Sequence, residues 1–456
     1  LGDVYKRQAI EKLEKEWNEY PVLHFSLAGG KHMEKEQLDQ YLLYILKENE
    51  DRFGVDYDSP APNVRLLNLI RTVTAKTGKQ AVVLIDEYDA PLLDVAHEKE
   101  KLEVLRNTMR NFDSPLKDCE PLLRFVFLTG ITKFSQLSIF SELNNIKNVS
   151  MDEPYAGICG ITKEEMLTQM SDDIDALAEQ LELGREETIE ELKDHYDGYH
   201  FTWPSPDVFN PYSLLNCFAD GRVDDYWFGS GTPTYLINMM RKYDFLPADL
   251  GETIEVGKKD FDAATETMTT IIPLLYQSGY LTIKKYNPIL QSYQLDYPNK
   301  EVRVGMVRSL APNYLSPISL NNNSFIFDFL EQLYNNNMDG ALQKMQAYLA
   351  SISNRLANKN EKDFQTVFYL IFNLMGAYIL VEEDSAIGRA DAVLHMPDTI
   401  YVMELKFDKT AEEALKQIDD KGYLIPYSAD GKRMVKVGIN YDSQKRTIGE
   451  WKIAEG

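Results

Sequence analysis

Residues 388–406 read GRADAVLHMPDTIYVMELK and bring two carboxylates and a lysine into one short stretch. Two extended runs, residues 389–396 and 399–407, are rich in valine, isoleucine, leucine and tyrosine, and Pro397-Asp398 between them is a turn signal. This pattern predicts a β-hairpin. Pairing of its two strands brings Asp391 near the end of the second strand that carries Glu404.

Glu404 and Lys406 are two residues apart on the second predicted strand, so both side chains leave the same face of the hairpin. Asp391 and Glu404 repel each other at this distance unless a cation lies between them, and Mg²⁺ (or Mn²⁺) held by oxygen ligands is the usual solution. Lys406 then orients an attacking water or helps to deprotonate it, which is the chemistry of metal-assisted phosphodiester hydrolysis. The alternative is a solvated strand face on which glutamate and lysine pair weakly, for at most about 1 kcal/mol.

The succession of G-R-x-D, a hairpin, E-x-K and a helix carrying Q-I resembles the PD-(D/E)XK nuclease superfamily. The resemblance implies that Asp391 and Glu404 hold the metal, and that Lys406 and Gln417 complete the catalytic site. It also implies an acidic residue contributed by the preceding helix. Glu361 and Glu382 are both candidates for that place.

The segments around the hairpin predict the α-β-β-β-α-β order of that superfamily. Apolar residues repeat at helical spacing from Phe364 to Met375, and Asn360 is placed as the N-cap. Residues 411–421 predict a helix, and residues 434–439 alternate as a strand. We therefore expect a restriction-endonuclease-like α/β domain over residues 336–456.

A chain of 456 residues can bury more than one core, which predicts two or three domains. Its hydrophobic content of 44% and charged content of 26% are typical of soluble globular proteins. No apolar run approaches the roughly 18 residues of a membrane span, and the amino terminus has no signal-peptide pattern. These features predict a cytoplasmic protein that does not act at a membrane.

Cysteine and histidine spacing supports neither a disulfide framework nor a zinc site. Cys119, Cys159 and Cys217 lie far apart and match no metal-binding pattern. His195 and His200 flank an aromatic turn, but at five residues apart they do not share a helix face. We interpret both histidines as structural.

The net charge of −24 excludes a basic groove that covers the whole molecule. Residues 336–456 hold 15 Lys+Arg and 18 Asp+Glu, a balance of −3, so the remaining −21 belongs to residues 1–335. The carboxy-terminal third is the least acidic part of the chain. Contact with the phosphates of a nucleic acid is therefore expected to be local, and a divalent metal would offset the acidic cluster.

The amino-terminal region alternates strands and helices. The chain begins with Leu1, and we interpret it as a fragment with a non-native leader that joins a charged helix over residues 9–19. Residues 22–27 and 80–86 predict strands, and residues 34–49 and 63–76 predict helices. Alternation of this kind indicates a parallel α/β sheet.

Asp86 and Glu87 come directly after the buried strand VVLI, at its carboxyl end, where open α/β sheets bind their ligands. In P-loop ATPases an aspartate at this place holds Mg²⁺ through water, and a following glutamate activates the attacking water. The alternative is that acidic residues merely follow a buried strand.

Further along, the chain reads FVFLTGITKFS from Phe125, then YAGICGITKEEM, HYDGYHF, FNPYSLL and YWFGSGTP. This series resembles the AAA-ATPase-like family of bacterial and archaeal proteins, many of which end in a PD-(D/E)XK domain, and the resemblance covers nearly the whole chain. It implies that Asp86 and Glu87 are the Walker B pair and that Thr129 is a sensor near the γ-phosphate. Residues 196–201 and 210–213 would belong to a helical lid, with a packed aromatic corner as the alternative.

One departure from that family is the phosphate loop, because no G-x-x-x-x-G-K-[ST] occurs in the sequence. Residues 28–32, AGGKH, are the nearest approach. In the family this loop lies upstream of the point where the present sequence begins, so truncation explains its absence. We expect ATP to be bound by the full-length protein, and weakly or not at all by this fragment.

Residues 260–278 predict a helix, and GYLTIKKY with YQLDYPNKEVRV predicts a hairpin after it, together a winged-helix-like unit that we interpret as a spacer. Residues 321–323, three asparagines, are a loop signal, and residues 325–345 are amphipathic. The expected domains are a truncated AAA-ATPase-like core over residues 1–160, a helical lid and winged-helix-like region over residues 161–335, and the nuclease-like domain over residues 336–456.

The sequence thus predicts an α/β protein: a truncated P-loop ATPase-like parallel sheet with a helical lid, a winged-helix-like middle unit and a C-terminal restriction-endonuclease-like domain. The predicted function is an ATPase-like protein fused to a metal-dependent nuclease-like domain that cleaves phosphodiester bonds of a nucleic acid. The alternative is a nucleotide-responsive signalling or binding module whose nuclease-fold domain only recognises nucleic acid or a partner. The sequence leaves open DNA or RNA as substrate and the oligomeric state.

Overall fold

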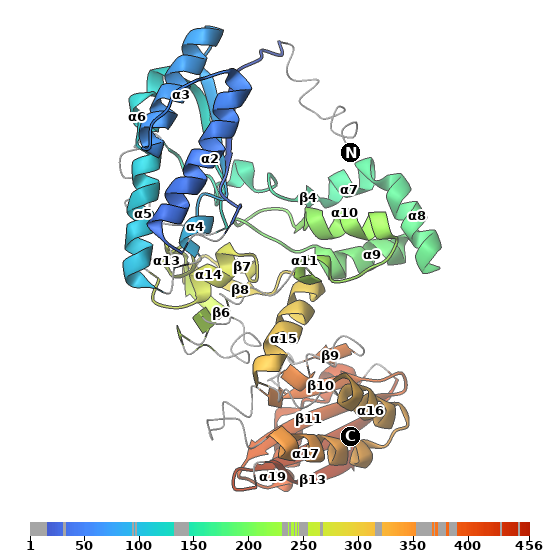
Figure 1. The fold of residues 1–456 in the computed structure, drawn as a ribbon. Helices are drawn as coiled ribbons and strands as arrows, with labels where there is room; N and C mark the ends of the chain where they lie inside the picture. Colours follow the sequence, from blue (N-terminus) through green and yellow to red (C-terminus); the bar gives the residue numbers. More distant parts are fainter. Residues whose placement is uncertain are drawn as a thin grey trace. The chain divides into compact units, whose positions relative to one another are not determined.

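A computed structural model describes most of the chain (Figure 1). The described residues are 16–30, 33–93, 95, 98–131, 146–229, 236, 239–240, 242–243, 245, 254–264, 268–314, 322–352, 367–368, 370–372, 380–382, 390–428, 431–445 and 447–456. They fall into two compact units, residues 1–148 with 259–278, and residues 149–258 with 279–456. The predicted domain boundaries at residues 160 and 335 stay a prediction.

The first unit is built on a three-stranded parallel sheet in the order β1-β2-β3, as the alternation of strands and helices predicted. Its strands are β1 (Val22–Ser26), β2 (Ala81–Asp86) and β3 (Leu123–Leu128). Its helices are α2 (Lys35–Phe53), α3 (Pro62–Thr77), α4 (Ala90–Leu93), α5 (Lys99–Asp113), α6 (Pro115–Asp118), the 3₁₀ turn η2 (Glu120–Leu122), α13 (Lys258–Phe261, whose first residue belongs to the second unit) and α14 (Ile272–Gln277).

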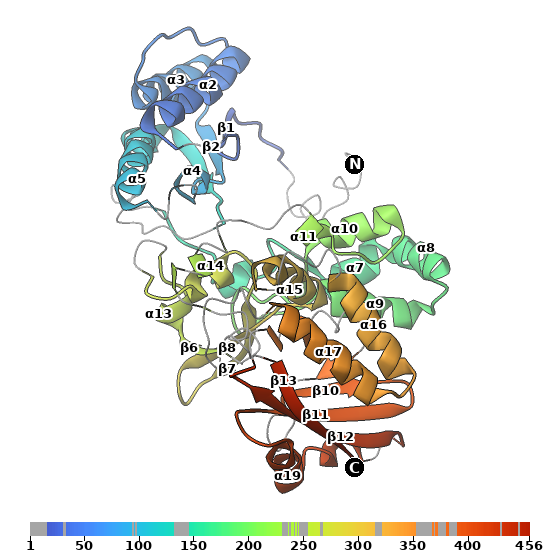
Figure 2. The ribbon, with the colours of Figure 1, turned by 60° about the horizontal axis from the view of Figure 1, so that its bottom comes forward.

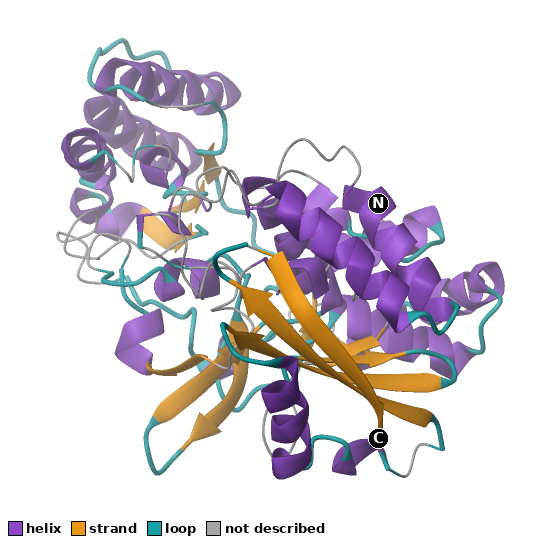
Figure 3. Ribbon diagram, turned by 90° about the horizontal axis from the view of Figure 1, so that it is seen from below, coloured by secondary structure: helices purple, strands orange, loops and turns teal. Residues whose placement is uncertain are grey.

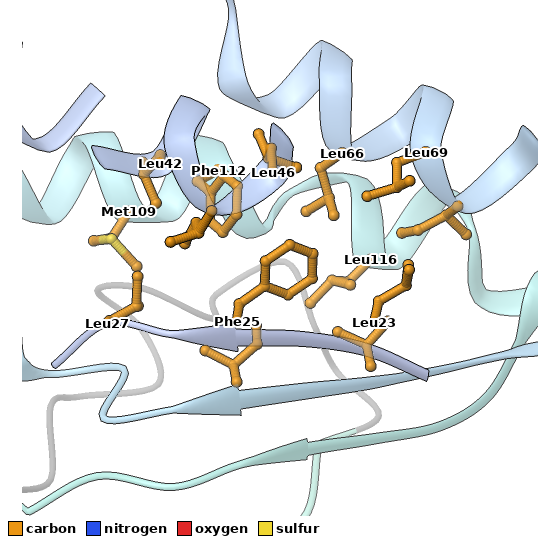
Figure 4. Packing of buried hydrophobic residues seen from close by; sticks show 14 of the residues in the cluster. Leu23, Phe25, Leu27, Leu42, Leu46, Leu66, Leu69, Met109, Phe112 and Leu116 are labelled. Carbon is orange, nitrogen blue, oxygen red and sulfur yellow. The ribbon is translucent and has the colours of Figure 1, made fainter. Parts of the chain in front are cut away.

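The core of the first unit lies between this sheet and its helices. Alternate residues of β1 point toward α2, α3 and α5, where Phe25 meets Phe112 edge to face at 6.0 Å between ring centroids (Figure 4). The period-2 pattern of the strand and the 3.6-residue pattern of the helices therefore meet at one apolar layer. The buried residues labelled there are Leu23, Phe25, Leu27, Leu42, Leu46, Leu66, Leu69, Met109, Phe112 and Leu116.

The second unit contains a small helical region, a three-stranded antiparallel sheet and a carboxy-terminal α/β domain. The helical region consists of η3 (Glu153–Tyr155), β4 (Ile161–Thr162), α7 (Lys163–Gln169), α8 (Ser171–Leu181), α9 (Arg185–Tyr196), β5 (Val208–Phe209), α10 (Pro211–Asp220) and α11 (Tyr226–Gly229). The antiparallel sheet has the order β6-β8-β7, with β6 (Ile254–Gly257), β7 (Thr282–Asn287) and β8 (Ser292–Asp296). A winged-helix arrangement of this region stays a prediction.

The carboxy-terminal domain is a five-stranded mixed sheet in the order β13-β12-β11-β10-β9. Its elements are α16 (Asn322–Tyr334), α17 (Met338–Ile352), β9 (Leu380–Glu382), β10 (Ala392–His395), β11 (Thr399–Phe407), α19 (Ala411–Lys421), the 3₁₀ turn η5 (Ile425–Tyr427), β12 (Arg433–Asp442) and β13 (Thr447–Glu455). Figures 2 and 3 show α17 and α19 on opposite faces of this sheet. Two consecutive residues of β13 contact the two helices from opposite faces: Trp451 donates to Asp339 of α17, and Lys452 pairs with Glu412 of α19.

Several expected elements are wrong or shorter than predicted. A helix was predicted over residues 9–19. Residues 16–20 are not helical, and residues 9–15 lie outside the described part of the chain. The single helix predicted over 260–278 is instead two short helices, because Pro273 belongs at a helix start and α14 begins at Ile272.

Two further segments differ. The strand expected at the end of YQLDYPNKEVRV stops at Asp296, and α15 (Lys300–Tyr314) begins where Asn299 accepts a hydrogen bond from the Val302 amide. The amphipathic run 325–345 is two helices, since Asn336 adopts φ 53° and ends α16. A loop was expected at residues 321–323, but α16 already begins at Asn322.

Candidate active site

The predicted hairpin forms, and its register sets the position of the first carboxylate. β10 and β11 pair antiparallel with Ala392 opposite Met403, so Asp391 lies just before β10 at the level of Glu404. The Leu405 amide donates a hydrogen bond to Asp391 Oδ2 at 2.6 Å. Asp391 is therefore held against the strand that carries Glu404 and Lys406.

Glu404 lies at the centre of the carboxy-terminal site. Its Oε1 accepts hydrogen bonds from Lys406 Nζ at 2.8 Å and from Gln417 Nε2. Its Oε2 is buried and has no hydrogen-bond partner, and the residue is only 2% exposed. The structure thus brings the predicted residues Asp391, Glu404, Lys406 and Gln417 together.

Burial of Glu404 and, second to it, the neighbouring negative charge of Asp391 together raise the pKa of Glu404 to about 7. The hydrogen bond and positive charge of Lys406 act against this rise. Two carboxylates with one ammonium group leave a deficit of positive charge, because only one of the two negative charges is compensated.

Gln417 reaches the site because α19 begins at a well-formed cap. Thr410 accepts from the Glu413 amide, and the Glu413 side chain accepts from the Thr410 amide, which together form a capping box. The side chain of Gln417 also donates to the Tyr423 hydroxyl at 3.4 Å. Tyr423 is buried, and sequence reasoning gave it no role in this site.

The acidic residue expected from the preceding helix stays undecided. Glu361 and Asn360 lie outside the described residues, while residues 367–368 and 370–372 are helical as predicted. Glu382 is the last residue of β9, and its backbone lies opposite Val393 of β10. Within the described part of the chain no group of three or more histidine, cysteine, aspartate or glutamate side chains is placed to hold a metal.

A second acidic site lies at the carboxyl end of β2. Thr129 follows β3 and donates its hydroxyl to Asp86 Oδ1, so the residues expected as sensor and metal ligand are in contact. Glu87 adopts φ 52°, a left-handed conformation that is rare for glutamate. Burial raises the pKa of Glu87, and the charges of Asp86 and Asp89 add to this rise.

Asp89 is a residue of this second site that sequence reasoning missed. It is fully buried, and its Oδ1 accepts from the Ile131 amide at 3.1 Å. The Tyr88 amide donates to the Thr129 carbonyl at 2.9 Å, so two hydrogen bonds tie the turn after β2 to the end of β3. The signal in the sequence was a third acidic residue in the run Asp86 to Asp89.

The two histidines interpreted as structural have polar side-chain neighbours. His195 Nε2 lies 3.3 Å from Asp225 Oδ1, and His200 Nε2 lies 2.7 Å from Asp207 Oδ1. Tyr196 is buried and donates its hydroxyl to the Asp224 carbonyl at 2.8 Å. These contacts agree with the packed aromatic corner considered for residues 196–201.

The fold and the two sites define a class of protein: a parallel α/β domain with acidic residues at a strand end, joined to a mixed sheet whose hairpin presents D…E-x-K. Family models agree. Residues 2–140 match the model described as predicted AAA-ATPase, and residues 359–451 match the PD-(D/E)XK nuclease superfamily.

Similarity to a curated relative extends along nearly the whole chain. An uncharacterized protein in the vnfD 5' region of Azotobacter chroococcum mcd 1 is 31% identical over 449 residues, which cover 94% of this chain and 82% of the relative. The chain belongs to this family of AAA-ATPase-like proteins that carry a PD-(D/E)XK nuclease superfamily domain. No helix among the described residues combines the length and apolar character that crossing a membrane requires.

Proposed function

We propose that the carboxy-terminal domain hydrolyses phosphodiester bonds of a nucleic acid with Mg²⁺ or Mn²⁺, and that the ATPase-like region makes the protein responsive to ATP. The observation that carries this proposal is the buried Glu404 Oε2, which has no hydrogen-bond partner and lies in a site shared with Asp391. A buried carboxylate oxygen without a donor is costly unless a cation approaches it.

The donor set fits a hard divalent cation, because Asp391, just before β10, and Glu404, on β11, offer carboxylate oxygens at the same level of the hairpin. These two residues would hold the ion. When bound, the ion would offset their negative charge, polarise the scissile phosphate and favour ionisation of an attacking water.

Lys406 and Gln417 act as positioning groups around Glu404. The ammonium of Lys406 has three donors; one goes to Glu404 Oε1, which leaves two for a water or a phosphate oxygen. Gln417 directs its amide nitrogen to Glu404 and to Tyr423, so its carbonyl oxygen is available to accept a hydrogen bond from the attacking water. Together they fix Glu404 in one rotamer and orient the nucleophile.

In the amino-terminal domain, Asp86 and Glu87 would serve as the Walker B pair, with Asp86 as the metal ligand, and Thr129 would sense the γ-phosphate. The contact between Thr129 and Asp86 supports this assignment, because it links the two strand ends at which a nucleotide would bind. We further propose a cytoplasmic protein with the domain boundaries predicted from the sequence and a middle region that serves as a winged-helix-like spacer.

The second candidate is a signalling or binding module whose nuclease-fold domain recognises nucleic acid or a partner without cleaving it. Its partner-binding form is favoured by the charge of residues 336–456, where 18 acidic residues outnumber 15 basic ones. Such a surface offers little general attraction for phosphates.

Divalent-metal titration separates the two candidates. We expect calorimetry to detect Mg²⁺ or Mn²⁺ binding by the full chain, and the Asp391→Asn variant to bind at least tenfold more weakly. Asp420→Asn is the matched control, since Asp420 is exposed on the same domain. If the full chain binds no metal, or if Asp391→Asn binds metal as tightly as the wild type, the binding module is favoured over the nuclease.

A further inference from the structure

The edge strand β13 of the carboxy-terminal sheet presents an open side. β13 stands first in the strand order β13-β12-β11-β10-β9, and within the described residues β12 is the one strand that pairs with it. The Gly456 amide donates to the Met434 carbonyl, so the even-numbered residues at this end of β13 bond to β12. Trp451 and Ile453 therefore direct their backbone N–H and C=O groups away from the sheet. An open row of such groups is a template for another strand.

The usable length of this edge is that of an ordinary strand. β9, at the opposite edge of the sheet, has three residues, whereas β13 has nine. The Ile448 carbonyl of β13 is already occupied, because the Gln346 side chain of α17 donates to it at 2.6 Å. Residues 449–455 are left to pair with a further strand, and this length is typical of strands in globular proteins.

The side chains of β13 carry a charge pattern that is complementary to itself. Glu450 and Lys452 leave the sheet on the α19 face, since Glu450 Oε1 accepts from the Ala411 amide at 3.0 Å and Lys452 pairs with Glu412. Both residues are exposed, and the Lys452 side chain keeps 52% of its accessible surface. Lysine on an edge usually blocks pairing, but a lysine two residues from a glutamate can meet the same pair in reverse order.

We propose that β13 pairs antiparallel with β13 of a second copy of this chain, with Trp451 opposite Trp451. In this register Glu450 of each copy lies opposite Lys452 of the other, and Ile453, which is 37% exposed, lies opposite Gly449. A shift of two residues places Glu450 opposite Glu450 in one direction, or Lys452 opposite Lys452 in the other. Charge therefore selects the first register. The product is a symmetric dimer in which two five-stranded sheets are continuous.

The symmetry of this pair fixes the face on which the two candidate active sites lie. The two-fold axis of an antiparallel pair of identical strands is perpendicular to the sheet, so each face of one sheet continues into the same face of the other. Glu404 contacts Gln417 of α19, on the face that also carries Glu450 and Lys452. Both copies of Glu404 lie on one face of the joined sheet, with the two β11 strands five strand spacings apart, roughly 24 Å. The interface itself does not depend on catalysis by Glu404.

Sedimentation of the full chain over a range of micromolar concentrations tests this pairing. We expect the wild type to dimerise, and Glu450→Lys and Lys452→Glu each to weaken dimerisation about tenfold, because each variant sets two like-charge pairs across the axis. An equimolar mixture of the two variants again places lysine opposite glutamate at both positions. The mixture should therefore form heterodimers about as tightly as the wild type dimerises.

Lys416→Glu on α19 is the matched control, because Lys416 is an exposed lysine of the same domain, and it should dimerise as the wild type does. Ile453→Pro removes an outward N–H and no bond to β12, a place where edge strands tolerate proline, and should be monomeric. Ile453→Ala keeps that N–H and should still dimerise.

A wild type that stays monomeric at every concentration would overturn the proposal. Folded charge variants whose mixture stays monomeric would overturn it too, because the loss in each variant would then not come from charges that face each other. If Ile453→Pro does not fold by circular dichroism, the charge variants and their mixture decide. Their folding is expected, since Lys452 and Glu412 form an exposed pair that contributes little to stability.

Discussion

Replacement of Glu404 by glutamine should stabilise the protein when no divalent metal is present. Glu404 is 2% exposed, and its Oε2 lacks a hydrogen-bond donor. Glutamine keeps an acceptor for Lys406 and Gln417 and removes the charge that burial and Asp391 disfavour. When the pKa of a carboxyl is higher in the folded than in the unfolded state, the protein loses stability as pH rises. The stability advantage of Glu404→Gln over the wild type is therefore largest above neutral pH.

The magnitude follows from the pKa. A rise from 4.5 to about 7 corresponds to about 3 kcal/mol once Glu404 is ionised, since one pKa unit is worth about 1.4 kcal/mol. A metal ion at a hundred times its dissociation constant stabilises the folded wild type by about 2.7 kcal/mol. The ion should therefore remove most of the difference between wild type and variant.

The assay is chemical unfolding at pH 8, in EDTA and in Mg²⁺ or Mn²⁺. We expect Glu404→Gln to exceed the wild type by about 2–3 kcal/mol in EDTA, and only the wild type to gain stability from the metal. Glu331→Gln is the control, because Glu331 is exposed on α16. A variant less stable than the wild type in EDTA would refute the claim that Glu404 is destabilising without a cation.

Three further predictions concern other residues. Asp391→Asn should also raise stability in EDTA, because it relieves repulsion of Glu404, and should lose the gain from Mg²⁺; thermal unfolding with and without metal checks both. Asp113 is buried without a hydrogen-bond partner and burial raises its pKa to about 8, so Asp113→Asn should exceed the wild type by a few kcal/mol at pH 9 and show little difference at pH 4. Thr410→Ala removes the cap of α19 and should cost about 1 kcal/mol, measured by urea unfolding.

Local signals predicted the segments on which the two sites lie. The hairpin was evident because Pro397-Asp398 separates two runs of β-branched and aromatic residues. A single pairing register of the two strands buries the apolar side chains of both runs. The buried strand before Asp86 was evident from its continuous apolar run. The helix over residues 411–421 was predicted to the residue, because its cap residues Thr410 and Gly422 stand at its ends.

Periodicity misled where a helix is broken by its own asparagines or prolines. The run 325–345 keeps a helical pattern through Asn336, although that residue turns the chain by adopting a left-handed conformation. A pattern of apolar residues does not distinguish one long helix from two that pack on each other. The segment YQLDYPNKEVRV was predicted as part of a hairpin, yet Asn299 within it caps a helix.

The residues that meet at Glu404 could be predicted from the sequence, but the energetic cost of burying Glu404 could not. Which oxygen of Glu404 lacks a donor depends on where Gln417 of α19 lies, and that is a tertiary contact. Asp89 gave a weaker signal still, since one more acidic residue after Asp86 and Glu87 is unremarkable in a chain with 72 acidic residues. Its role depends on burial, which only the fold reveals.

Cleavage by the Lys406→Ala variant tests the central claim most directly. Plasmid, single-stranded DNA and RNA would each be incubated with the wild type and the variant, in EDTA, Mg²⁺ and Mn²⁺, with Lys416→Ala as the control for an exposed lysine of the same domain. The account predicts cleavage of at least one substrate by the wild type only with metal, and a loss of about 10²–10³ in rate for a folded, metal-binding Lys406→Ala. Equal rates for wild type and variant, or no cleavage of any substrate, would contradict it.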